Sequence, residues 1–147
     1  MVLHWELPEP PMSHPLQTLA RPWMARLLAA ATVAYTGVLV FATHYPRPEE
    51  LLGPNAPSDK TLHFVAYAVL AALATATWLT ARRTASRGIA ALAIALCGFG
   101  AIDEITQPFF RRHADPLDWV YDCIGIGIGI AAVVSVMALV RRFARAQ

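Results

Sequence analysis

The chain has 147 residues, of which 56% are hydrophobic and 15% are charged, and its formal net charge is +2. Soluble domains carry about 25% charged residues, so this composition is typical of a membrane protein, and the length allows a single domain. The arginines lie at the ends of apolar segments and form no basic stripe, so we expect no nucleic-acid partner.

Residues 1–20 are rich in proline and polar side chains, and we expect them to form a mobile tail ahead of a membrane domain at residues 21–147. Four apolar segments follow, at about residues 24–42, 62–80, 88–106 and 119–140. Most of them reach the ~20 residues that a helix needs to cross a hydrocarbon layer of about 30 Å. The sequence therefore predicts an all-α membrane protein, a bundle of four transmembrane helices.

The basic residues predict the orientation of these helices. One side of the membrane would have eight of them: Arg21, Arg26, Arg82, Arg83, Arg87, Arg141, Arg142 and Arg145. The other side would have four: Arg47, Lys60, Arg111 and Arg112. Because the side richer in basic residues is normally cytoplasmic, both termini should be cytoplasmic, and the first and third loops should lie outside.

Ionisable residues gather at the predicted outer ends of three helices. At 1.5 Å per residue, His63, Glu104 and Asp122 lie about 26–28 Å from the inner arginines next to their own helices, and so reach the same depth. This depth is the outer edge of the hydrocarbon layer. An ionised carboxylate there costs roughly 2–3 kcal/mol even on lenient scales, so Glu104 should face protein or a water-filled pocket and have a partner.

Helical spacing places several of these polar residues on shared faces. The sets are Asp59, His63 and Tyr67 on the second helix, Glu104 and Gln107 on the third, and Asp118, Asp122, Gly125 and Gly129 on the fourth. The two glycines form a small-xxx-small pattern, which permits close approach of a neighbouring helix. Pro108 predicts that the third helix ends near Gln107.

The polar pattern resembles that of the VanZ-like membrane proteins. The resemblance covers roughly residues 58–130 and consists of Asp59-Lys60-x-x-His63-Phe64-x-x-Tyr67, Glu104-x-x-Gln107, Arg112, Asp118, Asp122 and Gly125. Two positions differ, since Arg111-Arg112 stands where the family often has Gly-Arg, and Asp122 where it often has Asn. The resemblance implies a small multi-pass protein of the bacterial cytoplasmic membrane, in a family whose prototype is linked to teicoplanin resistance.

Two classes of function are compatible with these residues. In the first, the protein is an enzyme at the headgroup level of the outer leaflet, where His63, Glu104 and Asp118 supply general acid and base. Lys60 and Arg112 would bind the phosphate or carboxylate of a lipid-linked envelope substrate. The other residues expected to bind this substrate are Asp59, Tyr67, Gln107 and Asp122.

In the second class, the protein is not an enzyme, and the charges form a network that joins helices or binds an envelope ligand among the membrane lipids. The expected pairs are Asp59 with Lys60 or Arg112, Glu104 with His63, and Asp118 with Arg111. Ser58 or Asp59 could serve only as a helix cap. His63 with two or three carboxylates could also hold a divalent ion, although the spacing matches no known metal signature and the sequence indicates no particular cofactor.

Overall fold

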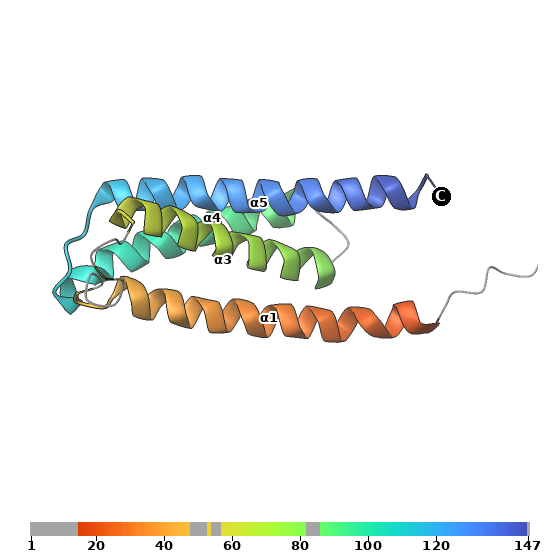
Figure 1. The fold of residues 1–147 in the computed structure, drawn as a ribbon, viewed down its shortest axis with the longest axis horizontal. Coiled ribbons are helices and arrows are strands. Elements are labelled where there is room, and N and C mark those ends of the chain that lie inside the picture. The colour runs from red at the N-terminus through yellow and green to blue at the C-terminus, as the bar shows by residue number, and fades with distance from the viewer. Residues whose placement is uncertain (1–14, 48–52, 54–56, 82–85, 147) are drawn as a thin grey trace, which may run out of the picture.

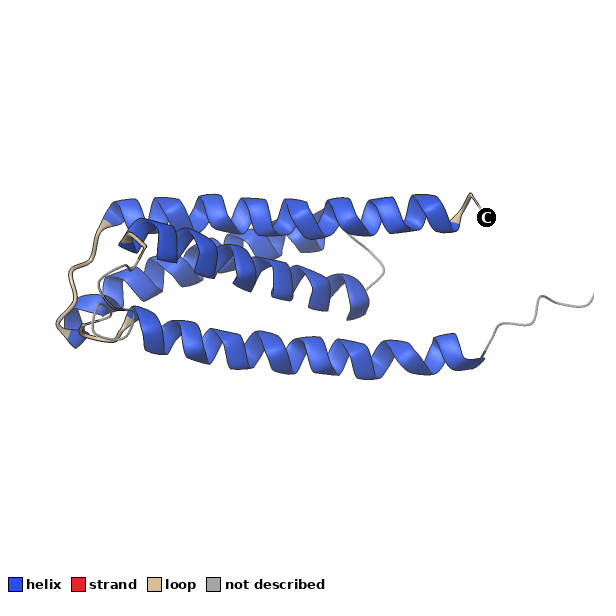
Figure 2. Ribbon diagram, viewed as in Figure 1, coloured by secondary structure: helices blue, strands red, loops and turns tan. Residues whose placement is uncertain are grey.

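The computed structural model of the chain describes residues 15–47, 53, 57–81 and 86–146. Its helices are α1 (Pro15–Thr43), α3 (Asp59–Ala81), α4 (Ser86–Thr106), the short 3-10 helix η1 (Gln107–Phe110) and α5 (Pro116–Ala144) (Figure 1 and Figure 2). Four segments are long and apolar enough to cross a membrane: Pro22–Thr43, Asp59–Ala81, Arg87–Phe110 and Pro116–Ala144. The described residues thus form a multi-pass, all-α membrane bundle, as predicted.

Three of these helices begin earlier than hydropathy alone predicts. α1 starts at Pro15, inside the stretch predicted as a tail, because a proline is well tolerated in the first helical turn, where its missing N–H has no partner to lose. Residues 1–14 of that predicted tail lie outside the described residues. α3 and α5 begin at Asp59 and Pro116 rather than at about residues 62 and 119. Asp59 and Asp118 are therefore fixed on helices and do not belong to loops.

Consecutive long helices run in opposite directions (Figure 1). The start of α1 and the end of α5 lie at one end of the bundle, and the end of α1 and the starts of α3 and α5 lie at the other. α3 lies between α1 and α5, and it packs most extensively against α5. This topology brings the polar ends of α3, α4 and α5 together, as the sequence predicts.

Two glycines allow the close packing of α5 on α3. A Cβ atom at Gly125 would overlap the carbonyl oxygen of Phe64, and one at Gly129 would overlap the carbonyl oxygen of Ala68. Any larger side chain would force the two helices apart. The small-xxx-small interpretation of Gly125 and Gly129 is therefore confirmed.

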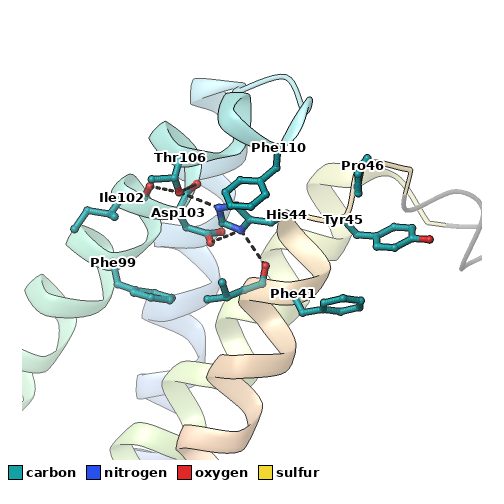
Figure 3. A pocket seen from close by; sticks show the side chains of 10 residues that line it. Phe41, His44, Tyr45, Pro46, Phe99, Ile102, Asp103, Thr106 and Phe110 are labelled. Atoms are coloured by element: carbon teal, nitrogen blue, oxygen red, sulfur yellow. Dashed lines mark hydrogen bonds and ion pairs between the residues drawn. The ribbon is translucent and has the colours of Figure 1, made fainter.

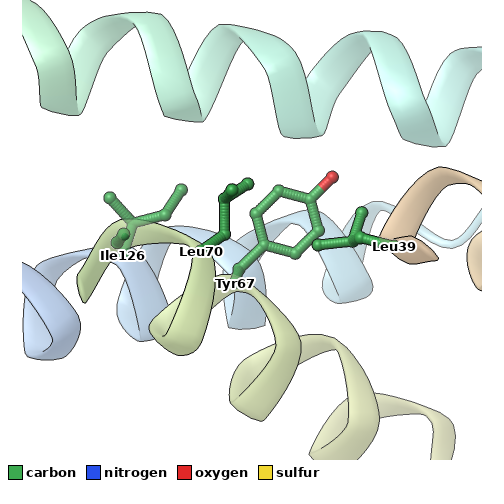
Figure 4. Packing of buried hydrophobic residues seen from close by; sticks show 5 residues of the cluster. Leu39, Tyr67, Leu70 and Ile126 are labelled. Atoms are coloured by element: carbon green, nitrogen blue, oxygen red, sulfur yellow. The ribbon is translucent and has the colours of Figure 1, made fainter. Parts of the chain in front are cut away.

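The buried apolar core is small, and most apolar side chains face outward. The core consists of Leu39, Tyr67, Leu70, Ala71 and Ile126 (Figure 4). Large side chains such as Val33, Ile94 and Phe109 are 73%, 74% and 83% exposed. A soluble protein rarely exposes so much contiguous apolar surface, whereas a lipid-embedded bundle does so along its length.

Candidate functional site

The helix starts at the polar end of the bundle are capped by neighbouring side chains. The backbone N–H of Thr61 donates to Ser58 Oγ at 3.3 Å, so Ser58 caps α3 and leaves the carboxylate of Asp59 for another partner. Asp115 caps α5, because its Oδ1 accepts from the N–H of Leu117 at 2.9 Å. Both caps set the position of the ionisable residues that follow in the first turn.

One turn into α3 and α5, an imidazole meets a carboxylate. His63 Nδ1 lies 3.0 Å from Asp122 Oδ1, and the two side chains are 3% and 0% exposed. The hydrogen bond fixes the orientation of the ring, and it leaves Nε2 as the nitrogen open to a ligand. His63 and Asp122 therefore form a buried acid–base pair between α3 and α5.

Two cations lie nearer the end of the bundle than this pair, in the first turn of α3 and just after η1. Lys60 Nζ is 2.8 Å from Asp115 Oδ2 and 3.5 Å from Asp118 Oδ1. Arg112 Nη2 is 2.8 Å from Asp59 Oδ2. The hydrogen bond from Lys60 holds the pKa of the Asp115 carboxyl below its ordinary value, and the N–H of Leu117 acts in the same direction. Asp115 was not among the residues predicted for the site.

Glu104 is buried and has protein partners, as the sequence predicts. Its Oε1 accepts from the backbone N–H of Asp115, and its Oε2 accepts from Gln107 Nε2 at 3.2 Å. Glu104 is 5% exposed and Gln107 is fully buried. The side chain thus joins the end of α4 to the start of α5.

Of the three ion pairs expected for a charge network, one is present and two are wrong. Asp59 pairs with Arg112, as expected. Glu104 does not bond to His63. The imidazole of His63 is instead hydrogen-bonded to the buried Asp122, and Glu104 accepts from the backbone N–H of Asp115. Asp118 faces Lys60 rather than Arg111, because Arg111 ends η1 in the left-handed conformation, with φ 62°, and its side chain is exposed.

A cavity of about 180 Å³ lies between α1 and α3 beside these groups. Its walls combine apolar and ionisable side chains, namely Leu39, Ala42, Thr43, Asp59, Leu62, His63, Ala66 and Arg112. The ionisable members are those that the preceding hydrogen bonds hold in place. The surface that faces the cavity is nonetheless almost entirely apolar, and the Asp59–Arg112 ion pair borders it.

Not every predicted site residue reaches this cavity. Tyr67, Gln107 and Asp122 are each 0% exposed, and the Tyr67 side chain extends toward α4 (Figure 4). Asp122 acts on His63, and Gln107 acts on Glu104. None of these three residues lines the cavity, and neither do the predicted site residues Lys60, Glu104 and Asp118.

A second polar cluster, which the sequence interpretation missed, joins α1 to α4 (Figure 3). Thr43 Oγ1 donates to Asp103 Oδ1 at 3.0 Å, His44 Nδ1 lies 3.5 Å from the same oxygen, and His44 Nε2 lies 2.9 Å from Thr106 Oγ1. The ring of Phe110 contacts His44 edge-on at 4.7 Å between centroids. The available signal was Asp103, an acid in the last turns of an apolar helix.

This second cluster borders a cavity of about 590 Å³ between α1 and α4. Apolar side chains form most of its wall, including Val40, Phe41, Phe99 and Ile102. Figure 3 shows His44, Asp103 and Thr106 turned toward one another at its inner side, and Tyr45 turned away. The cluster therefore joins two helices at the edge of a largely apolar cavity.

Comparison of the chain with models of protein families, with curated proteins and with solved structures finds no match.

Proposed function

We propose that this chain is a VanZ-like protein of the bacterial cytoplasmic membrane that binds a phosphate-bearing, lipid-linked component of the cell envelope at its outer face. The residues of the VanZ-like pattern support this proposal by their positions. Asp59, Lys60, His63, Arg112 and Asp118 lie together at the end of the bundle where α3 and α5 begin. That end is the one that the arginine distribution assigns to the outside.

The observation that carries the proposal is that an ion pair and a buried imidazole border an apolar cavity between α1 and α3. Arg112 and His63 are among the lining residues, together with Leu39, Leu62 and Ala66, and nearly all of the surface that faces the cavity is apolar. An arginine can bind phosphate with two parallel hydrogen bonds, while the apolar wall suits a hydrocarbon chain. Because about 180 Å³ is below the ~300 Å³ of a typical ligand pocket, the cavity suits the junction of headgroup and chain rather than a whole lipid.

The same arrangement supports chemistry on the bound lipid. His63 can act as a general base through its second nitrogen, because Asp122 holds the ring through Nδ1. Lys60 and Arg112 would stabilise negative charge on the phosphate. No activated nucleophile stands beside His63 among the hydrogen bonds of the described residues, so water would be the nucleophile of a hydrolytic reaction.

A structural network is the second candidate function, and one observation favours it. Lys60 and Arg112 are already paired with carboxylates, and Glu104 accepts hydrogen bonds at both oxygens. Such pairs can fix the register of one helix relative to its neighbour without adding much stability. In that case the charges would hold α3, α4 and α5 together, and loss of one would impair folding rather than ligand binding.

The experiment that tests the proposal identifies the lipids that copurify with the protein, and it compares the envelope lipids of cells that have the protein with those of cells that lack it. Phosphorus-labelled lipids from cells with and without the protein would be separated by thin-layer chromatography, alongside lipids bound to the purified chain. We expect one phospholipid or prenyl-phosphate species to be enriched on the protein and reduced in Arg112→Ala. Equal enrichment in the wild type and in Arg112→Ala would contradict the proposal.

Arg111→Gly provides the matched control. It removes the same charge from the same loop, and glycine adopts the φ of 62° at position 111 without strain. We expect this variant to retain the bound lipid, whereas Arg112→Ala loses it although both fold. A link to glycopeptide resistance, which follows from the family resemblance alone, is tested by the teicoplanin susceptibility of the same strains.

A further inference from the structure

We propose that Asp59, His63 and Asp118 form a binding site for a divalent metal ion, with Asp122 as the residue that orients the imidazole. The inference rests on the proposed function, because the ion would lie where the phosphate of the lipid is expected. One carboxylate oxygen of each aspartate and one imidazole nitrogen lie within 4.8 Å of one another. Ligands of one metal at ~2.0–2.2 Å are roughly 3–4 Å apart, so small side-chain movements complete the site.

The unpartnered nitrogen of His63 is the observation that points to a ligand. The side chain is 3% exposed and lines the cavity between α1 and α3. Its Nδ1 bonds to Asp122, whereas Nε2 has no hydrogen-bond partner among the described residues. A metal-binding histidine nearly always holds a carboxylate or carbonyl with its other nitrogen, and Asp122 occupies that position here.

Both aspartates retain capacity for an ion despite their cationic neighbours. Asp59 accepts from Arg112 through Oδ2, and Asp118 meets Lys60 through Oδ1 at 3.5 Å, the weak limit of a hydrogen bond. An ionised carboxylate offers about four acceptor sites, so neither group is saturated. An ion bound to Asp59 would weaken its attraction for Arg112 and leave that guanidinium for the phosphate.

The donor set indicates the class of metal. Imidazole favours zinc and related transition metals, while carboxylates also suit manganese and magnesium, so one nitrogen with two carboxylates fits Mn²⁺ or Zn²⁺ best. Three protein ligands leave coordination positions open. A phosphate oxygen could fill one of them, and the ion would then join the carboxylates of the protein to the anionic headgroup.

Metal binding is measured on the full chain purified in detergent and stripped with a chelator. Mn²⁺ would be titrated, and the free ion followed by electron paramagnetic resonance. We expect one strong site per chain, at least a tenfold loss of affinity in Asp59→Asn and Asp118→Asn, and a loss of roughly 10–100-fold in Asp122→Asn. Asp103→Asn, in the cluster between α1 and α4, is the control and should bind Mn²⁺ as the wild type does.

Two further measurements make the result decisive even if one variant folds poorly. Asp59 is exposed, so Asp59→Asn should leave the helical circular dichroism unchanged. Pulsed resonance of the bound Mn²⁺ should show coupling to an imidazole nitrogen, and His63→Ala should abolish it. Absence of binding above the detergent background, or equal affinity in the wild type, Asp59→Asn and Asp118→Asn, would overturn the inference.

Lipid binding in the presence of chelator separates this inference from the proposed function. If the stripped protein still enriches the phosphate lipid but binds no Mn²⁺, the metal site is wrong and the lipid site stands. If Mn²⁺ binds with the expected variant pattern but no phosphate lipid is enriched with or without the ion, the metal site is correct and the proposed function is wrong.

Discussion

The imidazole of His63 on α3 shares a hydrogen bond of 3.0 Å with the carboxylate of Asp122 on α5, and both side chains are excluded from solvent. The pair joins the two helices that pack most extensively. Its members occupy equivalent positions, since each lies four residues after an aspartate of the same site, Asp59 or Asp118. The proposed site and the packing of α3 on α5 therefore share this contact.

Removal of the imidazole should be far more damaging than neutralisation of the carboxylate. His63→Ala leaves Asp122 buried without its partner, and breaking such a pair costs about 3–5 kcal/mol. Asp122→Asn keeps an oxygen or an amide for the hydrogen bond and should change the free energy of unfolding by less than about 1.5 kcal/mol. Reversible unfolding in mixed micelles measures both, and equal stability of His63→Ala and the wild type would show that the pair contributes nothing.

Glu104 should tolerate an amide but not truncation. In Glu104→Gln the new amide can still accept from the N–H of Asp115, and Gln107 can turn its own oxygen toward the new donor. Glu104→Ala leaves the Asp115 N–H and the buried Gln107 amide unsatisfied, at about 1–3 kcal/mol. Hydrogen exchange of the Asp115 amide should accelerate in Glu104→Ala and remain slow in Glu104→Gln. Rapid exchange already in the wild type would contradict this contact.

The Lys60–Asp115 contact should make stability depend on pH at the acidic end. The pKa of folded Asp115 is lowered from 3.8, so its contribution is fully present above that value and is lost as the pH falls through the lower, folded pKa. Asp115→Asn removes the charge but keeps a good helix cap. The unfolding midpoint of the wild type should therefore fall toward that of Asp115→Asn between about pH 4 and the folded pKa. Parallel curves for the two proteins would contradict the prediction.

The glycines of α5 should differ sharply in their tolerance of a methyl group. Gly129→Ala places a Cβ against the Ala68 carbonyl and should cost about 1–3 kcal/mol through separation of α3 and α5. A Cβ added at Gly127 would meet nothing within 4 Å, so Gly127→Ala is the matched control and should be neutral. Unfolding in micelles distinguishes them, and similar changes in stability at both positions would contradict the packing explanation.

Helical spacing and hydropathy predict most of the architecture because a bilayer imposes few choices. Four apolar segments must be helices, since no other open structure satisfies the backbone in lipid. Alternating directions then bring Asp59, Glu104 and Asp118 to one end whatever the detailed packing. The glycine pattern at Gly125 and Gly129 likewise predicts where a neighbouring helix packs closely on α5, because the residues at such a close contact must be small.

The exact partners within the site could not be predicted, because they depend on how the helices are rotated relative to one another. Spacing places His63 on the correct face but does not say whether Glu104 or Asp122 reaches it. The conformation of Arg111 at the end of η1 turns that side chain outward and leaves Arg112 for Asp59. His44 lies just beyond the end of α1, so helical spacing could not show that its side chain turns toward Asp103 on α4.

The orientation inferred from the arginines can be tested with cysteines at the two ends of the bundle. Ala114→Cys lies in the connection between η1 and α5, and Ala146→Cys lies just beyond α5, and both positions are exposed. Cys97 and Cys123, which are partly buried, would first be replaced by serine. A membrane-impermeant maleimide should label Ala114→Cys in intact cells and Ala146→Cys only after permeabilisation, because the cytoplasmic side has the greater number of arginines. The reverse pattern would place Asp59, His63 and Arg112 in the cytoplasm, and an envelope lipid of the outer leaflet could not then reach them.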